Sequence, residues 1–282
     1  MRAKRRILYL SCLLFIWSIF FGTSQAFAVP TAEDIATRVK EAIGAGATPE
    51  KAVKSVVAFA IVEGMTTKDA AAAATMGAIE AAVALRRDVN AAIQGAVIGA
   101  AGGAITAGLD MVGAIQGACH SAISGSAKMG DTLMAAQAAV GSSVSAAVRH
   151  DQDIALAAYA AVSGALSGAA DSGLSSEETD RIVYGAAQGA NAAAMATGQD
   201  LVAIESGIQS GALSAAGTFG FDAGAMAAAA AAGTADISEP EGFSPGEIEL
   251  GAMAAEDTAV PTVLEQKRDS IEPIPDPTAS PV

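Results

Sequence analysis

Residues that are good at starting helices recur along this chain at nearly constant intervals. Ser, Thr and Asp side chains stabilise a helix N-terminus because their oxygen accepts a hydrogen bond from a free backbone N–H. From Thr67 onward the successive intervals are 21, 22, 21, 22, 22, 25 and 22 residues. Each interval has room for one helix of about four turns and a tight connection. The recurring positions are Thr31, Thr48, Thr67, Asp88, Asp110, Asp131, Asp153, Ser175, Asp200 and Asp222.

Further boundary signals accompany several of these caps. Ser175 is followed three residues later by Glu178, the spacing of a capping box. Glycine often comes just before a cap, where its freedom to adopt a left-handed backbone can close the preceding helix. The glycines in this position are Gly108, Gly130 and Gly198.

Side-chain size also follows the interval. Counting from the cap, offsets 5, 9 and 13 are mostly bulky and apolar, as in Ile115, Cys119 and Ile123, whereas offsets 7 and 11 are small. Offsets 5 and 7 lie about 200° apart around a helix, so each helix carries a bulky ridge and a small ridge on opposite sides. Small residues let helix backbones approach closely. We therefore expect most helices to pack on two sides, against the helices before and after them, with a small ridge that includes Gly95, Gly99, Gly117, Gly164, Gly207 and Gly211.

Some units follow the pattern poorly. The unit from Asp200 has Glu205 and Gln209 at two bulky offsets, with Ile204 and Ile208 one residue earlier. The units from Thr67 and Ser175 also depart from the pattern.

The distribution of proline divides the chain. No proline occurs between Pro49 and Pro240, and this stretch is rich in alanine, which favours helix. Short connections make consecutive helices antiparallel, so two units form a hairpin of about 43 residues, a length found in two-helix solenoid repeats. Residues 29–235 are therefore predicted to form an all-α, Ala/Gly-rich array of about nine or ten short antiparallel helices, α-solenoid-like or layered. A compact, irregular helical bundle is the alternative.

The first 28 residues have the organisation of a secretory signal peptide. Four positive charges in MRAKRR precede an apolar run, Ile7 to Phe21, which is followed by a short polar stretch and Ala26-Phe27-Ala28. This is the order of charged region, apolar region and small-x-small cleavage site. We predict cleavage after Ala28, with Ala26 as the alternative, and export to the periplasm or the exterior. An uncleaved membrane anchor is the competing interpretation.

Residues 236–282 differ in composition from the array. They contain seven prolines, eleven acidic residues and two basic residues. Such a segment buries too little apolar surface to offset the entropy lost on ordering. A disordered acidic tail is predicted.

Charge and aromatic content exclude several classes of function. The net charge of −14 becomes −18 once the four basic residues of the leader are removed, which argues against binding nucleic acid or anionic lipid surfaces. The single Trp lies in the leader, and six Phe and Tyr side chains remain, too few for a stacking platform. We expect no cofactor and no metal, and a partner that is another protein or a second copy of this chain.

Three polar groupings are candidates for chemistry. Cys119 and His120 are adjacent, and neighbours on a helix point about 100° apart, so a buried structural cysteine is favoured over a nucleophile. The segment from His150 to Asp153 is explained by helix capping with fewer assumptions than a calcium site. Glutamines recur near the same offset, either bonding between helices or facing solvent: Gln94, Gln116 and Gln137.

The segment from Gly95 to Gly108, GAVIGAAGGAITAG, resembles the glycine zippers of bacterial envelope proteins. The resemblance covers about one unit. It implies close helix packing within or against a membrane. The sequence favours a non-enzymatic, exported structural or interaction protein of the bacterial envelope or exterior, with a membrane-inserting glycine-zipper oligomer as the alternative.

Overall fold

The computed structural model describes residues 29–236 and Phe243 of the 282-residue chain. The proposed leader and almost all of the proposed tail lie outside the described residues. Within the described part all regular structure is α-helical and no strand occurs, which confirms the predicted all-α class. The helices are α2 (Ala32–Gly44), α3 (Pro49–Val62), α4 (Thr67–Ala84), α5 (Val89–Thr106), α6 (Val112–Ala127), α7 (Thr132–Arg149), α8 (Ile154–Asp171), α9 (Ser176–Thr197), α10 (Leu201–Phe219) and α11 (Ala223–Ala235).

Most of the predicted caps begin helices as expected. Ser175 forms the predicted capping box, in which its hydroxyl accepts the Glu178 N–H and the Glu178 carboxylate accepts the Ser175 N–H at 2.9 Å. Side-chain oxygens at six other predicted positions also accept N–H groups of the first turn: Thr31, Thr48, Asp88, Asp153, Asp200 and Asp222.

Three predicted caps differ in detail. Thr66, rather than Thr67, caps α4, because its hydroxyl accepts the Asp69 N–H at 3.1 Å. Asp110 accepts the Val112 N–H at 2.9 Å, although the residue that directly precedes α6 is Met111. Asp131 precedes α7 without a side-chain cap hydrogen bond.

Every connection between these helices contains one residue with a left-handed backbone. Gly108, Gly130 and Gly198 have φ values of +77°, +79° and +68°, as predicted from their position before a cap. Two connections place a residue with a Cβ in this conformation instead, Arg86 at φ 53° and Asp151 at φ 52°. A side chain makes this backbone region unfavourable by roughly 1–2 kcal/mol.

Replacing Arg86 with glycine is therefore expected to stabilise the fold. The strain relieved exceeds the extra entropy that glycine adds to the unfolded chain, for a net gain of about 1 kcal/mol. Thermal unfolding of Arg86→Gly measures this. Gly173→Ala is the matched control with the opposite sign, because Gly173 has φ +65° and open space around it. A lower melting temperature for Arg86→Gly would contradict the strain argument.

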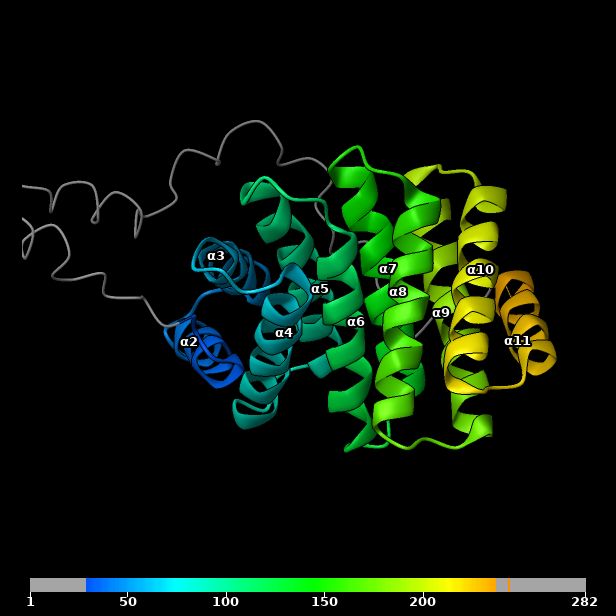
Figure 1. The fold of residues 1–282 in the computed structure, drawn as a ribbon, viewed down its shortest axis with the longest axis horizontal. Helices are drawn as coiled ribbons and strands as arrows, with labels where there is room; N and C mark the ends of the chain where they lie inside the picture. The colour runs from blue at the N-terminus through cyan, green and yellow to red at the C-terminus, as the bar shows by residue number, and fades with distance from the viewer. Residues whose placement is uncertain (1–28, 237–242, 244–282) are drawn as a thin grey trace, which may run out of the picture. The chain divides into compact units, whose positions relative to one another are not determined.

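The helices pack in two layers according to whether their number is even or odd. In one layer α4 contacts α2, α6 contacts α4, α8 contacts α6 and α10 contacts α8. In the other, α5 contacts α3, α7 contacts α5, α9 contacts α7 and α11 contacts α9. Figure 1 shows α4, α6, α8 and α10 side by side, with α5, α7 and α9 behind them. Each helix thus has its main partner two places away in the chain.

The bulky ridge forms the core. Ile115, Cys119 and Ile123 on α6 have no exposed surface. In α10 the buried residues are Ile204 and Ile208, one position before the offsets expected from Asp200. The matching positions of α8, Ala157 and Ala161, are buried as well, so the isoleucines of α10 fill positions that face the core in both helices, and Glu205 and Gln209 are half-exposed.

The glycines of the small ridge lie against the backbone of the helix two places earlier. A Cβ added at Gly99 would collide with the Glu50 carbonyl oxygen of α3, and one added at Gly207 with the Ala155 carbonyl oxygen of α8. Gly117 lies in the same way on the Lys68 carbonyl, and Gly164 on the Gln116 carbonyl. A Cβ added at Gly95 would lie 3.1 Å from Pro49 Cβ, and one added at Gly211 would lie 2.8 Å from the Tyr159 carbonyl oxygen. Glycine brings these backbones within reach of Cα–H···O contacts.

The direction of these contacts fixes the orientation of the helices. Gly164 lies on Gln116, and Gly168, one turn later, lies on His120, one turn later in α6. The positions advance together, so α6 and α8 are parallel. The small ridge therefore joins parallel helices within one layer. We expected each helix to pack mainly against the helices before and after it. In the structure its main partners are the preceding and following helices of the same layer, two places away in the chain.

Candidate functional site

Half-exposed polar side chains occupy one stripe of α6 and of α8. The stripe falls at offsets 6, 10 and 14 from the cap, and the other residues in the middle of these helices are largely buried. We call the surface formed by this stripe on α6 and α8, with the neighbouring parts of α4 and α10, the even face. The stripe residues are Gln116, His120 and Ser124 of α6 and Tyr159, Ser163 and Ser167 of α8.

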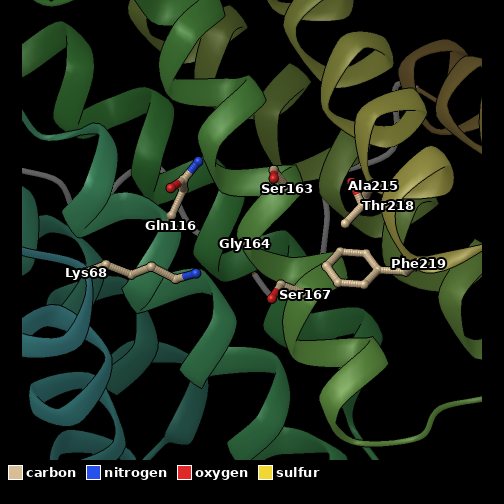
Figure 2. Close-up of a pocket in the computed structure, with 8 residues that line it drawn as sticks. All are labelled: Lys68, Gln116, Ser163, Gly164, Ser167, Ala215, Thr218 and Phe219. Atoms are coloured by element: carbon tan, nitrogen blue, oxygen red, sulfur yellow. The ribbon is translucent and has the colours of Figure 1, made fainter.

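A shallow groove of about 160 Å³ crosses the even face. In Figure 2 the Lys68 ammonium and the Gln116 amide lie on one side, the Phe219 ring lies on the other, and Ser163 and Ser167 lie between them. Gly164, Ala215 and Thr218 complete the lining. Four helices that are consecutive in one layer thus contribute a cation, an amide, hydroxyls and an aromatic ring to one surface.

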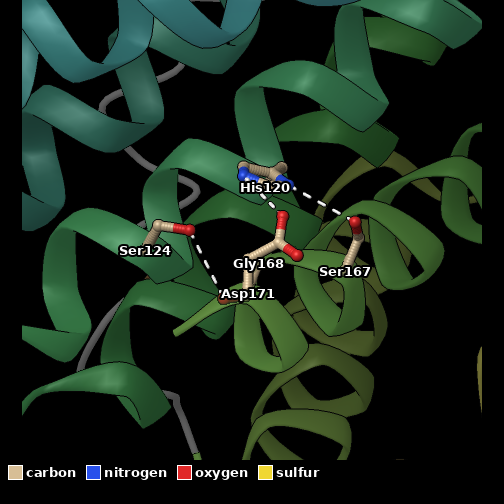
Figure 3. A network of polar contacts seen from close by, with 5 residues as sticks. All are labelled: His120, Ser124, Ser167, Gly168 and Asp171. Atoms are coloured by element: carbon tan, nitrogen blue, oxygen red, sulfur yellow. Dashed lines mark hydrogen bonds and ion pairs between the residues drawn. The ribbon is translucent and has the colours of Figure 1, made fainter. Parts of the chain in front are cut away.

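Next to the groove, His120 joins α6 to α8. Its Nδ1 lies 3.4 Å from Ser167 Oγ and its Nε2 lies 3.6 Å from Asp171 Oδ2 (Figure 3). Ser124 Oγ donates to the Gly168 carbonyl at 3.3 Å. Partial burial lowers the pKa of His120; Asp171 opposes this shift and Lys68 adds to it. The imidazole is therefore neutral at physiological pH and able to hydrogen-bond at both ring nitrogens.

These side chains have the residue types of a Ser-His-Asp triad but a different geometry. Both distances from His120 exceed those of a hydrogen-bonded triad. Ser167 also lies in the interior of α8, where backbone N–H groups bond to carbonyls one turn earlier and are unable to stabilise an oxyanion. The contact between His120 and Ser167 instead suits a role in holding the Ser167 hydroxyl at the groove.

Cys119 is fully buried beside this cluster. Its sulfur lies 3.4 Å from Ser143 Oγ, and burial raises the pKa of the thiol to about 12. The reactive form of a cysteine is the thiolate, which is therefore scarce here. The side chain acts as a small apolar residue of the core, in line with the structural interpretation of the Cys119-His120 pair.

The polar segment from His150 to Asp153 makes a helix boundary. Asp153 Oδ1 accepts the N–H groups of Ala155 and Leu156 at 2.9 and 3.0 Å. Just before the segment, Arg149 of α7 donates to Glu50 of α3 at 2.6 Å. The ion pair joins the two helices that pack on either side of α5. Within the described ranges, no group of three or more His, Cys, Asp or Glu side chains is placed to hold a metal ion.

The recurring glutamines have different environments in the two layers. Gln116 on the even face is half-exposed and lines the groove. Gln94 and Gln137 in the odd-numbered helices are buried, with exposed fractions of 8 and 4 %. Gln137 donates to Gln188 of α9 at 2.8 Å, so this pair does bond between helices. We call the corresponding stripe of α5, α7 and α9 the odd face.

Sequence reasoning found Gln116 but not the cluster around His120. Ser167 is 47 residues from His120, and nothing local in either segment signals the partner. The signal was present in the offsets, since His120 and Ser163 occupy offset 10 in their units and Ser124 and Ser167 occupy offset 14. These offsets place the four side chains on one stripe of their helices, but they do not indicate that α6 and α8 are neighbours.

Among the helices that the structure describes, α5 and α8 are long and apolar enough to cross a membrane. Buried residues make up 67 and 56 % of these segments within the helical packing. Core helices of water-soluble proteins have the same property, so length and composition are weak evidence for spanning.

Searches of protein-family models, curated proteins and solved structures found no match to this chain.

Proposed function

We propose that this chain is an exported, non-enzymatic structural or interaction protein of the bacterial envelope or exterior, in which close-packed helical repeats present a binding or self-assembly surface. The observation that carries the proposal is the groove of the even face, where four helices of one layer bring together Lys68, Gln116, Ser163, Ser167 and Phe219. The export component rests on the composition of residues 1–28.

The repeat is part of this proposal. One helix recurs about every 21–22 residues, caps and stripes recur at the same offsets, and each helix packs on the one two places earlier. An α-solenoid-like array of this kind places equivalent positions of successive helices side by side, which builds extended binding surfaces. The polar stripe of the even face is such a surface.

The chemistry of the groove favours a protein partner or a second copy of this chain. It is shallow and open, and its hydroxyl and amide groups suit the backbone of an extended polypeptide. Phe219, with 39 % of its surface exposed, provides an apolar contact beside them. The net charge of −18 that remains without the leader disfavours nucleic acid.

Photo-crosslinking tests the proposal. A photoreactive phenylalanine at position 163 is expected to capture one defined protein, or a second copy of the chain, in the periplasmic or extracellular fraction. The same probe at Ser55, exposed on α3, is the control and should not yield that adduct. Thr218→Arg in the position-163 variant should abolish it by blocking the groove. Equal adducts from both positions, or none from either, would contradict a binding role for the even face.

The alternative, a membrane-inserting glycine-zipper oligomer, is favoured by the length and apolar character of α5 and α8. In that case the glycines would pack against other copies in lipid. Gly99 and Gly164 instead lie on α3 and α6 of the same chain. A membrane role would require these intramolecular contacts to open.

A further inference from the structure

The odd face differs from the even face in being closed. The stripe positions Gln137, Gly141 and Ser145 of α7 are all buried, whereas Ser163 and Ser167 at the matching offsets of α8 are half-exposed. On α5 the neighbours of this stripe are side chains of the helical part, such as Lys54 and His150 beside Gly102. On α7 one neighbour comes from beyond α11.

Phe243, which follows α11 in the sequence, is seated on this face. It has only 2 % of its surface exposed. A Cβ added at Gly141 would lie 2.7 Å from Cδ2 and 2.8 Å from Cγ of the Phe243 ring, and 2.9 Å from the Gly189 carbonyl oxygen of α9. The absence of a side chain at Gly141 therefore leaves a notch between α7 and α9 that the ring fills.

A second attachment lies at Asp236, where α11 ends. Tyr184 Oη donates to the Asp236 carboxylate, and Gln188 Nε2 donates to the same oxygen at 2.9 Å. Asn191 Nδ2 donates to the Thr234 carbonyl at 3.1 Å. All three donors belong to α9. Polar groups of α9 thus hold the end of α11, and the notch beside them holds the aromatic ring seven residues later.

The glutamine pair connects the two attachments. Gln137 of α7 donates to Gln188 Oε1, which leaves the Gln188 amide group directed at Asp236. Buried amides of this kind need defined partners, because an unpaired polar group in a low-dielectric site is costly. This hydrogen-bonded chain ends on Asp236, the C-cap of α11, and so fixes where the chain leaves that helix, close to the notch.

We propose that the notch at Gly141 and Gly189 is a docking site for a phenylalanine carried by an acidic peptide, and that this chain's own Phe243 occupies it. The chain thereby carries its own ligand and keeps the notch closed to other molecules. The peptide chemistry follows from the occupant, since Phe243 is set in the sequence Glu239-Pro-Glu-Gly-Phe-Ser-Pro-Gly-Glu247. This site is separate from the groove of the even face and does not depend on its function.

The test supplies the peptide in trans. A fluorescent peptide of residues 239–247 is titrated against the full-length chain and against full-length Phe243→Ala, with binding read from fluorescence anisotropy. The variant, whose notch is empty, is expected to bind the peptide at least tenfold more tightly than the parent chain. Phe221→Ala is the matched control: Phe221 lies against Phe219 and away from the notch, so this variant should behave like the parent.

Two further measurements make the outcome specific. The same peptide with alanine in place of phenylalanine should not bind, and Gly141→Val in the Phe243→Ala background should abolish binding by filling the notch. Circular dichroism confirms that each variant remains helical. Equal affinity of parent and Phe243→Ala, absence of binding to Phe243→Ala at millimolar peptide, or binding that survives Gly141→Val would each overturn the proposal. Crosslinking at position 163 would be unaffected by any of these results.

Discussion

Gly207→Leu is expected to destabilise the fold by about 1–3 kcal/mol, because the new side chain has no space. A Cβ at this position would already collide with the Ala155 carbonyl oxygen, and it would lie 3.0 Å from the Ala155 carbonyl carbon. Backbone atoms inside a helix move only if the whole helix moves. Gly99→Leu should behave in the same way against Glu50 of α3. Thermal unfolding of residues 29–282, in buffer free of detergent, measures the effect.

Gly217 provides a control within the same helix. It lies in α10 ten residues after Gly207, is exposed, and has nothing within 4 Å of its added Cβ. Gly217→Leu should be neutral or stabilise by up to about 1 kcal/mol, since leucine is the better helix former. Leucine variants at 207 and 99 that melt at or above the parent temperature would refute close packing at the small ridge.

The same measurement separates the two proposed functions. In the packed array, the glycine variants lose stability without any lipid. In a membrane-inserting oligomer they would leave a water-soluble monomer unchanged and disrupt oligomers in detergent. A parent protein that stays in solution only with detergent would favour the membrane alternative.

Leu166→Ala is expected to cost about 2–5 kcal/mol. Leu166 has no exposed surface, and it is one of few large side chains in a core made mainly of alanine. Alanine neighbours are too short to collapse into the space left behind, so most of the cavity would remain. For a domain of this size the loss corresponds to a fall in melting temperature of very roughly 5–15 °C.

Leu156 is the matched control in the same helix. It has 45 % of its surface exposed, so Leu156→Ala removes little buried area. Alanine also has the highest helix propensity, which offsets part of the loss. A fall in melting temperature as large as that of Leu166→Ala would show that burial in the α8 core is not what makes Leu166 important.

Much of the helix arrangement along the chain was predictable, because the signals for it are local. A cap such as Ser175 and its Glu178 partner are three residues apart, and a left-handed glycine such as Gly198 acts on the helix end next to it. Thr66 and Thr67 show the limit of this reasoning. Both are threonines and cap helices equally well, so the choice between them depends on which hydroxyl reaches the Asp69 N–H.

The tertiary partners were less predictable. The sequence indicates that Gly164 belongs to a close contact but not that Gln116 is the partner, because the pairing depends on how the hairpins stack. The site was harder still. His120 meets Ser167 only through the parallel packing of α6 and α8, and Phe243 lies in a segment whose composition gave no reason to expect a buried side chain.

The direction of the glycine contacts has a consequence for how the protein is made. Gly164, Gly207 and Gly233 each lie on a residue about 50 positions nearer the N-terminus, in a helix that leaves the ribosome first. Each arriving helix can thus add to a surface that already exists, and growth of the array can keep pace with emergence of the chain. Phe243 arrives after all ten described helices and seats between α7 and α9. Its docking would mark the end of assembly, as a built-in signal that the array is complete.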